Sequence, residues 1–239
     1  MVDYPPFNIH PDSGIGPYLF EKIQENLQDY EIKIGFLPAK RLAEFFKQGK
    51  IKYIFHAPSP FEGTNLKNIL ILPMVKLVEK HAYIKQESLR VSEPILGFFQ
   101  GDSEEKNFIG TDKFKRVEIA SPASMVSMLE NGRLHFINCL IPMCTYLSKD
   151  RTKLMYLTKP KGLQESLGGL MVFKKNISMD KKEIQALQFA FRKVISSSTF
   201  KKDSTDYLET LNMKYDDIFP STFPTNSFIS LDSKLIFKF

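Results

Sequence analysis

The clearest hydrophobic pattern in the chain is a short amphipathic segment followed by an apolar run, and it occurs twice. In the first copy, Leu42, Phe45 and Phe46 recur at helical spacing, which predicts a helix with one apolar face. Gly49 follows, and glycine readily adopts the left-handed conformation that ends many helices. Residues 51–55 are then mostly apolar and short enough for a buried strand.

Residues 124–138 repeat this pattern. Met125 and Leu129 mark the apolar helical face, Gly132 stands at the turn, and residues 134–137 form the following apolar run. The two glycines lie about eighty residues apart, which is too long for the period of a solenoid and suits one copy in each of two lobes. The alternative is that such turns recur in any α/β protein, and the sequence alone favours the two interpretations about equally.

The remaining segments alternate between helical and extended patterns, which indicates an α/β protein with an open sheet. Helical patterns cover residues 17–27, 141–147, 178–196 and 206–211, and extended patterns cover residues 30–37, 69–73, 75–85, 95–99, 116–119, 153–158 and 170–173. The polar segment 86–94 is expected to cross from one lobe to the other, and residues 170–173 are expected to return the chain.

The composition is that of an ordinary soluble globular protein. The 239 residues are 43% hydrophobic and 25% charged, which is sufficient for one large domain or two lobes. No apolar run approaches the roughly 18 residues that a membrane span needs, and no signal peptide is recognisable. We therefore expect either a cytosolic protein or the mature form of an exported one.

Charge and cysteine content add little about partners. The net charge of +6 is spread among acidic residues along the chain, which is typical of a solvated surface and gives little support to nucleic-acid binding. A positive field does favour anionic ligands or partners. Cys139 and Cys144 are too few for a disulfide framework, and two free buried thiols are favoured over a local disulfide.

Several polar and aromatic residues stand in loops or at predicted strand ends, the edge at which open α/β sheets bind ligands. Two aromatic residues belong to a proline-stiffened loop near the start, and polar residues follow the strands that end near residues 55, 99 and 137. The candidates are Tyr4, Phe7, His56, Ser59, Gln100, Gly101, Asp102, Ser103, Asn138 and Cys139. Simple loop packing is an alternative of similar weight for these positions.

No sequence motif for catalysis or metal binding is present. The chain lacks H-E-x-x-H and G-x-S-x-G, and Asp102 is the only acid among the candidates. The four histidines are far apart in sequence, which leaves a metal site unsupported. We therefore predict no catalytic residue, no metal site and no cofactor.

Five motifs follow one another in an order that is hard to obtain by chance. They are D-Y-P-P-F, then G-x-x-x-x-L-F-E-K-I, P-A-K-R-L with a later G-K, E-N-G-R-L, and a late amphipathic helix, together spanning residues 3–215. With these motifs the chain resembles the bacterial extracellular solute-binding proteins of family 3, the polar amino acid-binding type. The resemblance implies the two-lobed, type II periplasmic-binding-protein fold, in which two crossover strands join the lobes and ligand is held between them by hinge closure.

The resemblance also implies lobe boundaries and roles for individual residues. Lobe 1 would comprise residues 1–88 and 177–239, and lobe 2 residues 89–176. The aromatic candidates would flank the ligand, and the loop candidates would offer polar groups to it. Arg41 occupies the arginine of the family's P-x-x-R pattern and is a further candidate as an anion contact. A structural salt bridge is the slightly favoured alternative for Arg41.

The charged groups that grip an amino acid in that family are missing here. The repeated unit in the family usually reads Gly-basic-x-Asp, but Lys52 and His135 occupy the two Asp positions. The stretches that should supply an arginine for the α-carboxylate and an acid for the α-ammonium are residues 62–65 and 138–141, and neither does. Because a buried charge needs a partner, we expect the ligand not to be an ordinary free α-amino acid.

These observations together predict a periplasmic solute-binding protein, in its mature form without a signal peptide. It would capture a small molecule for the permease of an ABC transporter or for a sensor, as a monomer, without binding nucleic acid or inserting into a membrane. One alternative is a degenerate two-lobed protein that serves as an interaction module, motivated by the missing ligand charges. A cleft enzyme of the dehydratase type is a further alternative with less support.

Overall fold

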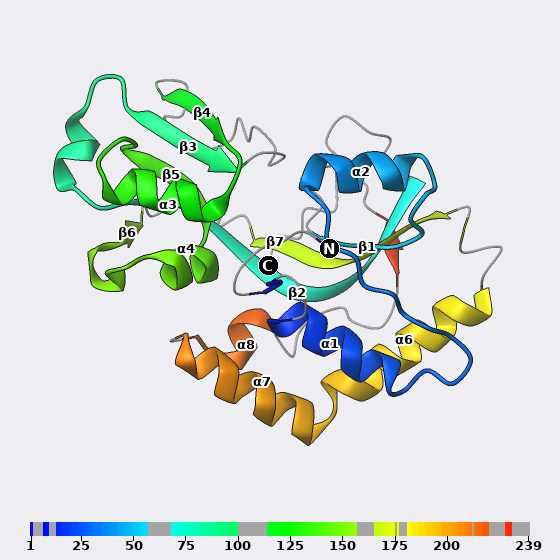
Figure 1. Cartoon of the computed structure of the whole chain (residues 1–239). Helices are drawn as coiled ribbons and strands as arrows, with labels where there is room; N and C mark the ends of the chain where they lie inside the picture. Colours follow the sequence, from blue (N-terminus) through cyan, green and yellow to red (C-terminus); the bar gives the residue numbers. More distant parts are fainter. Residues whose placement is uncertain are drawn as a thin grey trace. The chain divides into compact units, whose positions relative to one another are not determined.

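The chain passes between two structural units inside strands. The computed structural model describes residues 1, 7–9, 13–56, 68–99, 114–156, 165–174, 176, 181–211, 213–219 and 228–230. Unit 1 comprises Met1–Leu77 and Ser166–Phe237, and unit 2 comprises Val78–Glu165 (Figure 1). The chain therefore leaves unit 1 within β2 (Ile69–Tyr83) and returns at the start of β7 (Glu165–Phe173).

The strands of unit 1 surround the first half of β2. β1 (Ile54–His56) pairs antiparallel with β7, and β7 lies beside β2. The two-residue strand β8 (Ile229–Ser230) pairs antiparallel with β2, where Leu70 faces Ser230 in the register. β1 is the strand of the first sequence repeat, and it joins the sheet by pairing with β7.

Two of the helices of unit 1 contact these strands through aromatic ring pairs. The helices of this unit are α1 (Ile15–Gln24), α2 (Ala39–Lys47), α6 (Lys181–Ile195), α7 (Ser198–Thr210) and α8 (Tyr215–Ile218). α1 and α6 lie side by side, and Figure 1 shows α2 on the other side of the β7 and β2 strands. Ring pairs join α1 to β1 (Phe20 and Phe55, centroids 5.2 Å apart) and α2 to β7 (Phe46 and Phe173, 4.4 Å).

A hydrogen bond also ties the first helix to the C-terminal helices. The Tyr18 hydroxyl on α1 donates to Asp203 Oδ2 on α7 at 2.5 Å, and the Tyr18 ring stacks on Phe200. Burial and the hydrogen bond to Asp203 raise the pKa of Tyr18 to about 12. The phenol therefore remains a donor throughout the physiological pH range.

Unit 2 contains a mixed sheet that uses the second half of β2. β3 (Ile95–Phe99) pairs in parallel with both β4 (Lys115–Ile119) and β5 (Phe136–Leu140). β5 and β6 (Met155–Tyr156) both pair antiparallel with β2 at Ala82, so they flank it on opposite edges. The strand order is thus β4-β3-β5-β2-β6.

The helices of unit 2 are short. η3 (Gln86–Arg90) and η5 (Arg151–Lys153) are 3₁₀ helices, and α3 (Pro122–Glu130) and α4 (Ile141–Leu147) are α-helices. Ser121 caps α3, because its side chain accepts a hydrogen bond from the Ser124 N–H at 3.1 Å. α3 buries Met125 and Leu129, as their spacing predicts.

Both sequence repeats end their helix in the same way. Gly49 and Gly132 have φ angles of 73° and 71°, in the left-handed region. In the first copy, the N–H groups of Gly49 and Lys50 donate to the carbonyls of Phe46 and Phe45, each at 2.9 Å. The second copy repeats the pattern at residues 128–133, with distances of 3.0 and 2.9 Å. This is the Schellman arrangement, in which a left-handed residue satisfies the last carbonyls of a helix.

The structure differs from the sequence-based expectation in four segments. Residues 30–37 form no strand, residues 69–83 form one strand instead of two, and the helix expected at 206–211 begins at Ser198. Residues 86–94 were expected to cross between lobes but belong to unit 2 and include η3. Both unit boundaries accordingly lie earlier in the chain than the expected ones, 88/89 and 176/177.

We expect Gly49→Ala and Gly132→Ala each to lower the free energy of unfolding by about 1 kcal/mol, because an L-residue pays that cost in the left-handed region. The added methyl group itself meets nothing within 4 Å at Gly49 and only the Lys85 ammonium at 3.6 Å at Gly132. Chemical denaturation measures the effect. Gly35→Ala is the matched control, since Gly35 lacks a positive φ and has equal space; a loss as large as that of the other two would contradict the explanation.

Candidate functional site

Five of the residues singled out in the sequence lie in the described part of the chain. They are Phe7, Arg41, His56, Asn138 and Cys139. The other six, Tyr4, Ser59, Gln100, Gly101, Asp102 and Ser103, lie outside the described residues.

In unit 1, Phe7 belongs to a loop that folds back on the start of α1. Phe7 is buried, and its carbonyl accepts a hydrogen bond from the Gly16 N–H at 2.8 Å. Ile9 and Ser13 close the loop with two backbone hydrogen bonds, at 2.8 and 2.9 Å. Phe7 therefore contributes to the core of unit 1, as the packing interpretation of this loop expects.

Asn8 is a polar residue of this loop that the sequence analysis missed. Its side chain is buried against Gly16, where a Cβ would lie 1.9 Å from the Asn8 Oδ1, so no other residue fits there without a shift. Within the part of the chain that the structure describes, no donor reaches this oxygen. A buried acceptor without a donor costs about 1–3 kcal/mol and is a position where a ligand group can bind. The sequence carried no signal for it beyond its place after Phe7.

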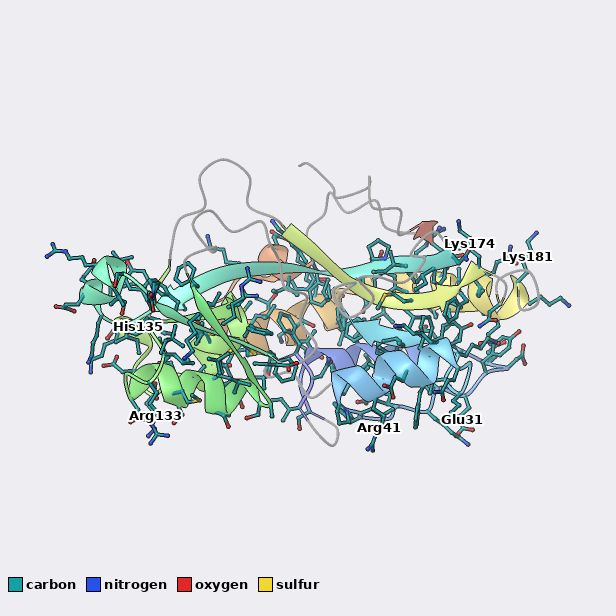
Figure 2. All side chains as sticks on the ribbon, turned by 90° about the horizontal axis from the view of Figure 1, so that it is seen from above. Glu31, Arg41, Arg133, His135, Lys174 and Lys181 are labelled. Atoms are coloured by element: carbon teal, nitrogen blue, oxygen red, sulfur yellow. The ribbon has the colours of Figure 1, made fainter. Side chains whose placement is uncertain are left out.

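Arg41 and His56 occupy very different positions. Arg41 is exposed on α2, and in Figure 2 its side chain extends outward from the helix. None of the ion pairs between described residues involves Arg41. His56 was expected in the loop directly after the strand and is instead the last residue of β1, where its backbone lies opposite Gly169 of β7.

In unit 2, Asn138 lies in the interior of β5 instead of at its end. It faces His81 of β2 in the register, and Cys139 faces Lys80. Asn138 is 8% exposed, and no described residue donates to its Oδ1. Unit 2 therefore holds a second buried amide oxygen without a donor among the described residues.

The expectation of two free thiols is wrong. Cys144, on α4, is fully buried and disulfide-bonded. The sequence contains one other cysteine, Cys139. A disulfide is typical of proteins that fold in an oxidising compartment.

The two residues at the Asp positions of the repeat make structural contacts. The Lys52 ammonium lies 2.5 Å from Oε2 of Glu183 on α6. His135 makes two hydrogen bonds with the backbone of Ile95. Its ring Nδ1 accepts from the Ile95 N–H, and its backbone N–H donates to the Ile95 carbonyl, each at 3.0 Å. Each change from Asp is thus matched by a local partner.

Other kinds of site have little structural basis. Among the described residues, no three histidine, cysteine, aspartate or glutamate side chains are grouped so as to hold a metal ion. None of the described helices combines the length and the apolar character that crossing a membrane requires. Apart from the exposed Arg41, Phe7 supplies an aromatic ring, and Asn8 and Asn138 supply neutral acceptors.

Solved structures with this arrangement of elements are numerous. The substrate-binding protein of an amino acid ABC transporter matches with a TM-score of 0.68 at 13% identity, over 87% of this chain and 99% of that one. The fold is that of the two-lobed periplasmic solute-binding proteins. Sequence comparison adds nothing, since no family model and no curated protein matches.

Two further structures show the range of proteins with the solute-binding fold. A solute receptor for L-cysteine from Neisseria gonorrhoeae matches with a TM-score of 0.67 at 13% identity, over 91% of this chain and 92% of that one. A histidine kinase sensor domain with similarity to periplasmic binding proteins matches with a TM-score of 0.63 at 13% identity, over 87% and 95%. At this identity the likeness concerns the fold.

We expect Asn138→Leu to raise the free energy of unfolding of the ligand-free protein by about 1 kcal/mol, because it removes a buried acceptor without a donor and keeps the shape. Asn138→Asp should lower it at neutral pH, since the carboxylate would be buried, and the loss should shrink as acid protonates the carboxyl group. Denaturation at two pH values measures both. A large loss for Asn138→Leu would show that the amide already has a partner.

Proposed function

We propose that the chain is an extracytoplasmic solute-binding protein that captures a small molecule in a cleft between its lobes by hinge closure. The observation that carries the proposal is the fold shared with binding proteins over most of both chains. Passage of the chain between units inside β2 and β7 supports it, because such strands can act as hinges. The disulfide at Cys144 supports a location outside the cytoplasm, in the periplasm.

The ligand that we propose is a small molecule other than an ordinary free α-amino acid. Among the described residues, the buried side-chain atoms without a hydrogen-bond partner are the amide oxygens of Asn8 and Asn138 and the hydroxyl of Ser204, all of which are uncharged. Arg41, the remaining cation among the described candidates, is exposed. A zwitterion needs a buried partner for each charge, whereas amide oxygens suit hydroxyl or N–H groups.

The partner that we propose is a transporter permease, with a sensor as the second candidate. The likeness to a histidine kinase sensor domain favours the sensor, since that domain uses the same fold. The chain would act as a monomer and without catalysis. The solved structures named above are binding and sensor proteins, which supports the absence of catalysis.

A thermal-shift screen over amino acids, peptides, polyamines, organic acids, sugars and nucleotides tests the proposal. A ligand at about 100 times its dissociation constant stabilises the folded state by roughly 2.7 kcal/mol, or several degrees at about 2–4 °C per kcal/mol for a chain of this size. We expect a hit outside the free α-amino acids. The Asn138→Leu variant should lose the shift, and Leu89→Phe, which changes an exposed residue, should keep it.

X-ray scattering then tests hinge closure. The hit ligand should reduce the radius of gyration of the wild-type protein, because closing a hinge makes a two-lobed protein more compact. A stable folded protein that neither shifts with any compound nor compacts would overturn the binding proposal and favour the interaction module.

A further inference from the structure

Unit 1 contains a cavity that the proposed cleft does not use. Its volume is about 300 Å³, and all the residues that line it belong to unit 1. It is open to solvent on the side of residues 31–35, most of which are exposed. Helices α1, α2 and α6 and strands β1 and β7 contribute apolar walls. The main apolar side chains are Phe20, Ile34, Leu42, Phe55, Leu170 and Leu187.

The cavity persists because its outer wall is not a regular strand. Residues 30–37 carry the alternating pattern of a strand, and Ile32 and Ile34 line the cavity. The Gln24 side chain holds this segment from α1: its Nε2 donates to the Tyr30 carbonyl at 2.9 Å and its Oε1 accepts from the Ile32 N–H at 2.5 Å. Met1 holds the far end of the segment: its terminal amino group donates to the Gly35 carbonyl at 2.6 Å, and its carbonyl accepts from the Leu37 N–H at 2.9 Å. A segment held at a few points leaves space that a strand ladder, packed at core density, would fill.

One polar group inside the cavity wall is arranged to accept a hydrogen bond. The Glu183 carboxylate receives the Lys52 ammonium at 2.5 Å on one oxygen and the Tyr53 hydroxyl at 2.8 Å on the other. A carboxylate can accept about four hydrogen bonds, so these two described donors leave room for a ligand donor. All three residues line the cavity.

The charged side chains around the cavity balance. Met1 also lines the cavity, and burial lowers the pKa of its terminal amine to about 6, so that this amine is mostly neutral at pH 7. Lys52 and Glu183 neutralise each other, and Glu31 and Lys33 pair at 3.4 Å with side chains 73% and 82% exposed. Figure 2 shows Glu31 directed away from the ribbon. A charged ligand would therefore lack a counter-charge, while a neutral one loses nothing by entering.

We propose that this cavity is a second binding site, for a neutral aromatic molecule of two fused rings that carries one N–H donor, such as an indole. A cavity of about 150 Å³ lined by Leu, Ile and Phe accommodates benzene in another protein, so about twice that volume suits two rings. Phe20 and Phe55, already in edge-to-face contact, offer aromatic neighbours, and Glu183 accepts the N–H. This site is independent of the cleft proposed above.

Indole itself is the probe, because the chain contains no tryptophan and indole emission reports on the ligand alone. We expect a saturable blue shift of indole emission when the wild-type protein is added. Leu187→Phe replaces an aliphatic side chain in the cavity wall by a bulkier aromatic ring and should weaken indole binding at least tenfold. Leu89→Phe is the matched control on the exposed surface of unit 2 and should bind like the wild type.

Three further variants distinguish a loss of indole binding at this site from misfolding and from binding in the cleft. Ile51→Phe fills the cavity from the segment between α2 and β1 and should weaken indole binding as Leu187→Phe does; circular dichroism checks that both variants fold. Glu183→Gln should weaken indole severalfold and leave naphthalene, which has no N–H, unchanged. Asn138→Leu should not affect indole. Absence of saturable binding, or equal affinity in the wild type and a folded filled variant, overturns the proposal without touching the proposed cleft.

Discussion

The left-handed glycine after α2 and α3 is the constraint on which both units depend. At each of these positions the chain has to leave a helix and enter a strand within a few residues, and the helix carbonyls have to find donors. Gly49 and Gly132 meet both demands with nearly equal φ angles and the same pair of backbone hydrogen bonds. β1 and β5 reach their sheets only because these turns set the direction of the chain.

Patterns that depend on local geometry were predictable from the sequence. The apolar spacing at residues 184, 187, 191 and 194 predicts α6, and all four side chains are buried. Residues 30–37 show the limit of periodicity as a signal. Their alternation suits a strand, but a strand also needs a neighbour along its whole length. The Gln24 side chain takes two of the bonds that a neighbouring strand would take. A bond of this kind has no periodic signature.

The candidate site was predictable by position more than by residue. The predicted strand ends led to His56, which is the last residue of β1, and to Asn138, which lies two residues before the end of β5. Asn8 was missed because the feature that marks it, a buried oxygen without a donor next to Gly16, arises only from tertiary packing. The disulfide at Cys144 was missed for a related reason, since cysteine spacing does not determine whether two thiols meet in the correct geometry.

Lys52 carries a positive charge at a position of the repeated motif where the related pattern has aspartate, and the fold supplies a partner for that charge. A lysine where the motif usually has aspartate would be costly if the site stayed half-buried and unpaired. Here α6 supplies Glu183, whose second oxygen accepts from the Tyr53 hydroxyl, so the lysine is paired within unit 1. The same pairing leaves the walls of the cavity without net charge. The preference of the cavity for neutral molecules therefore follows from how the fold accommodates Lys52.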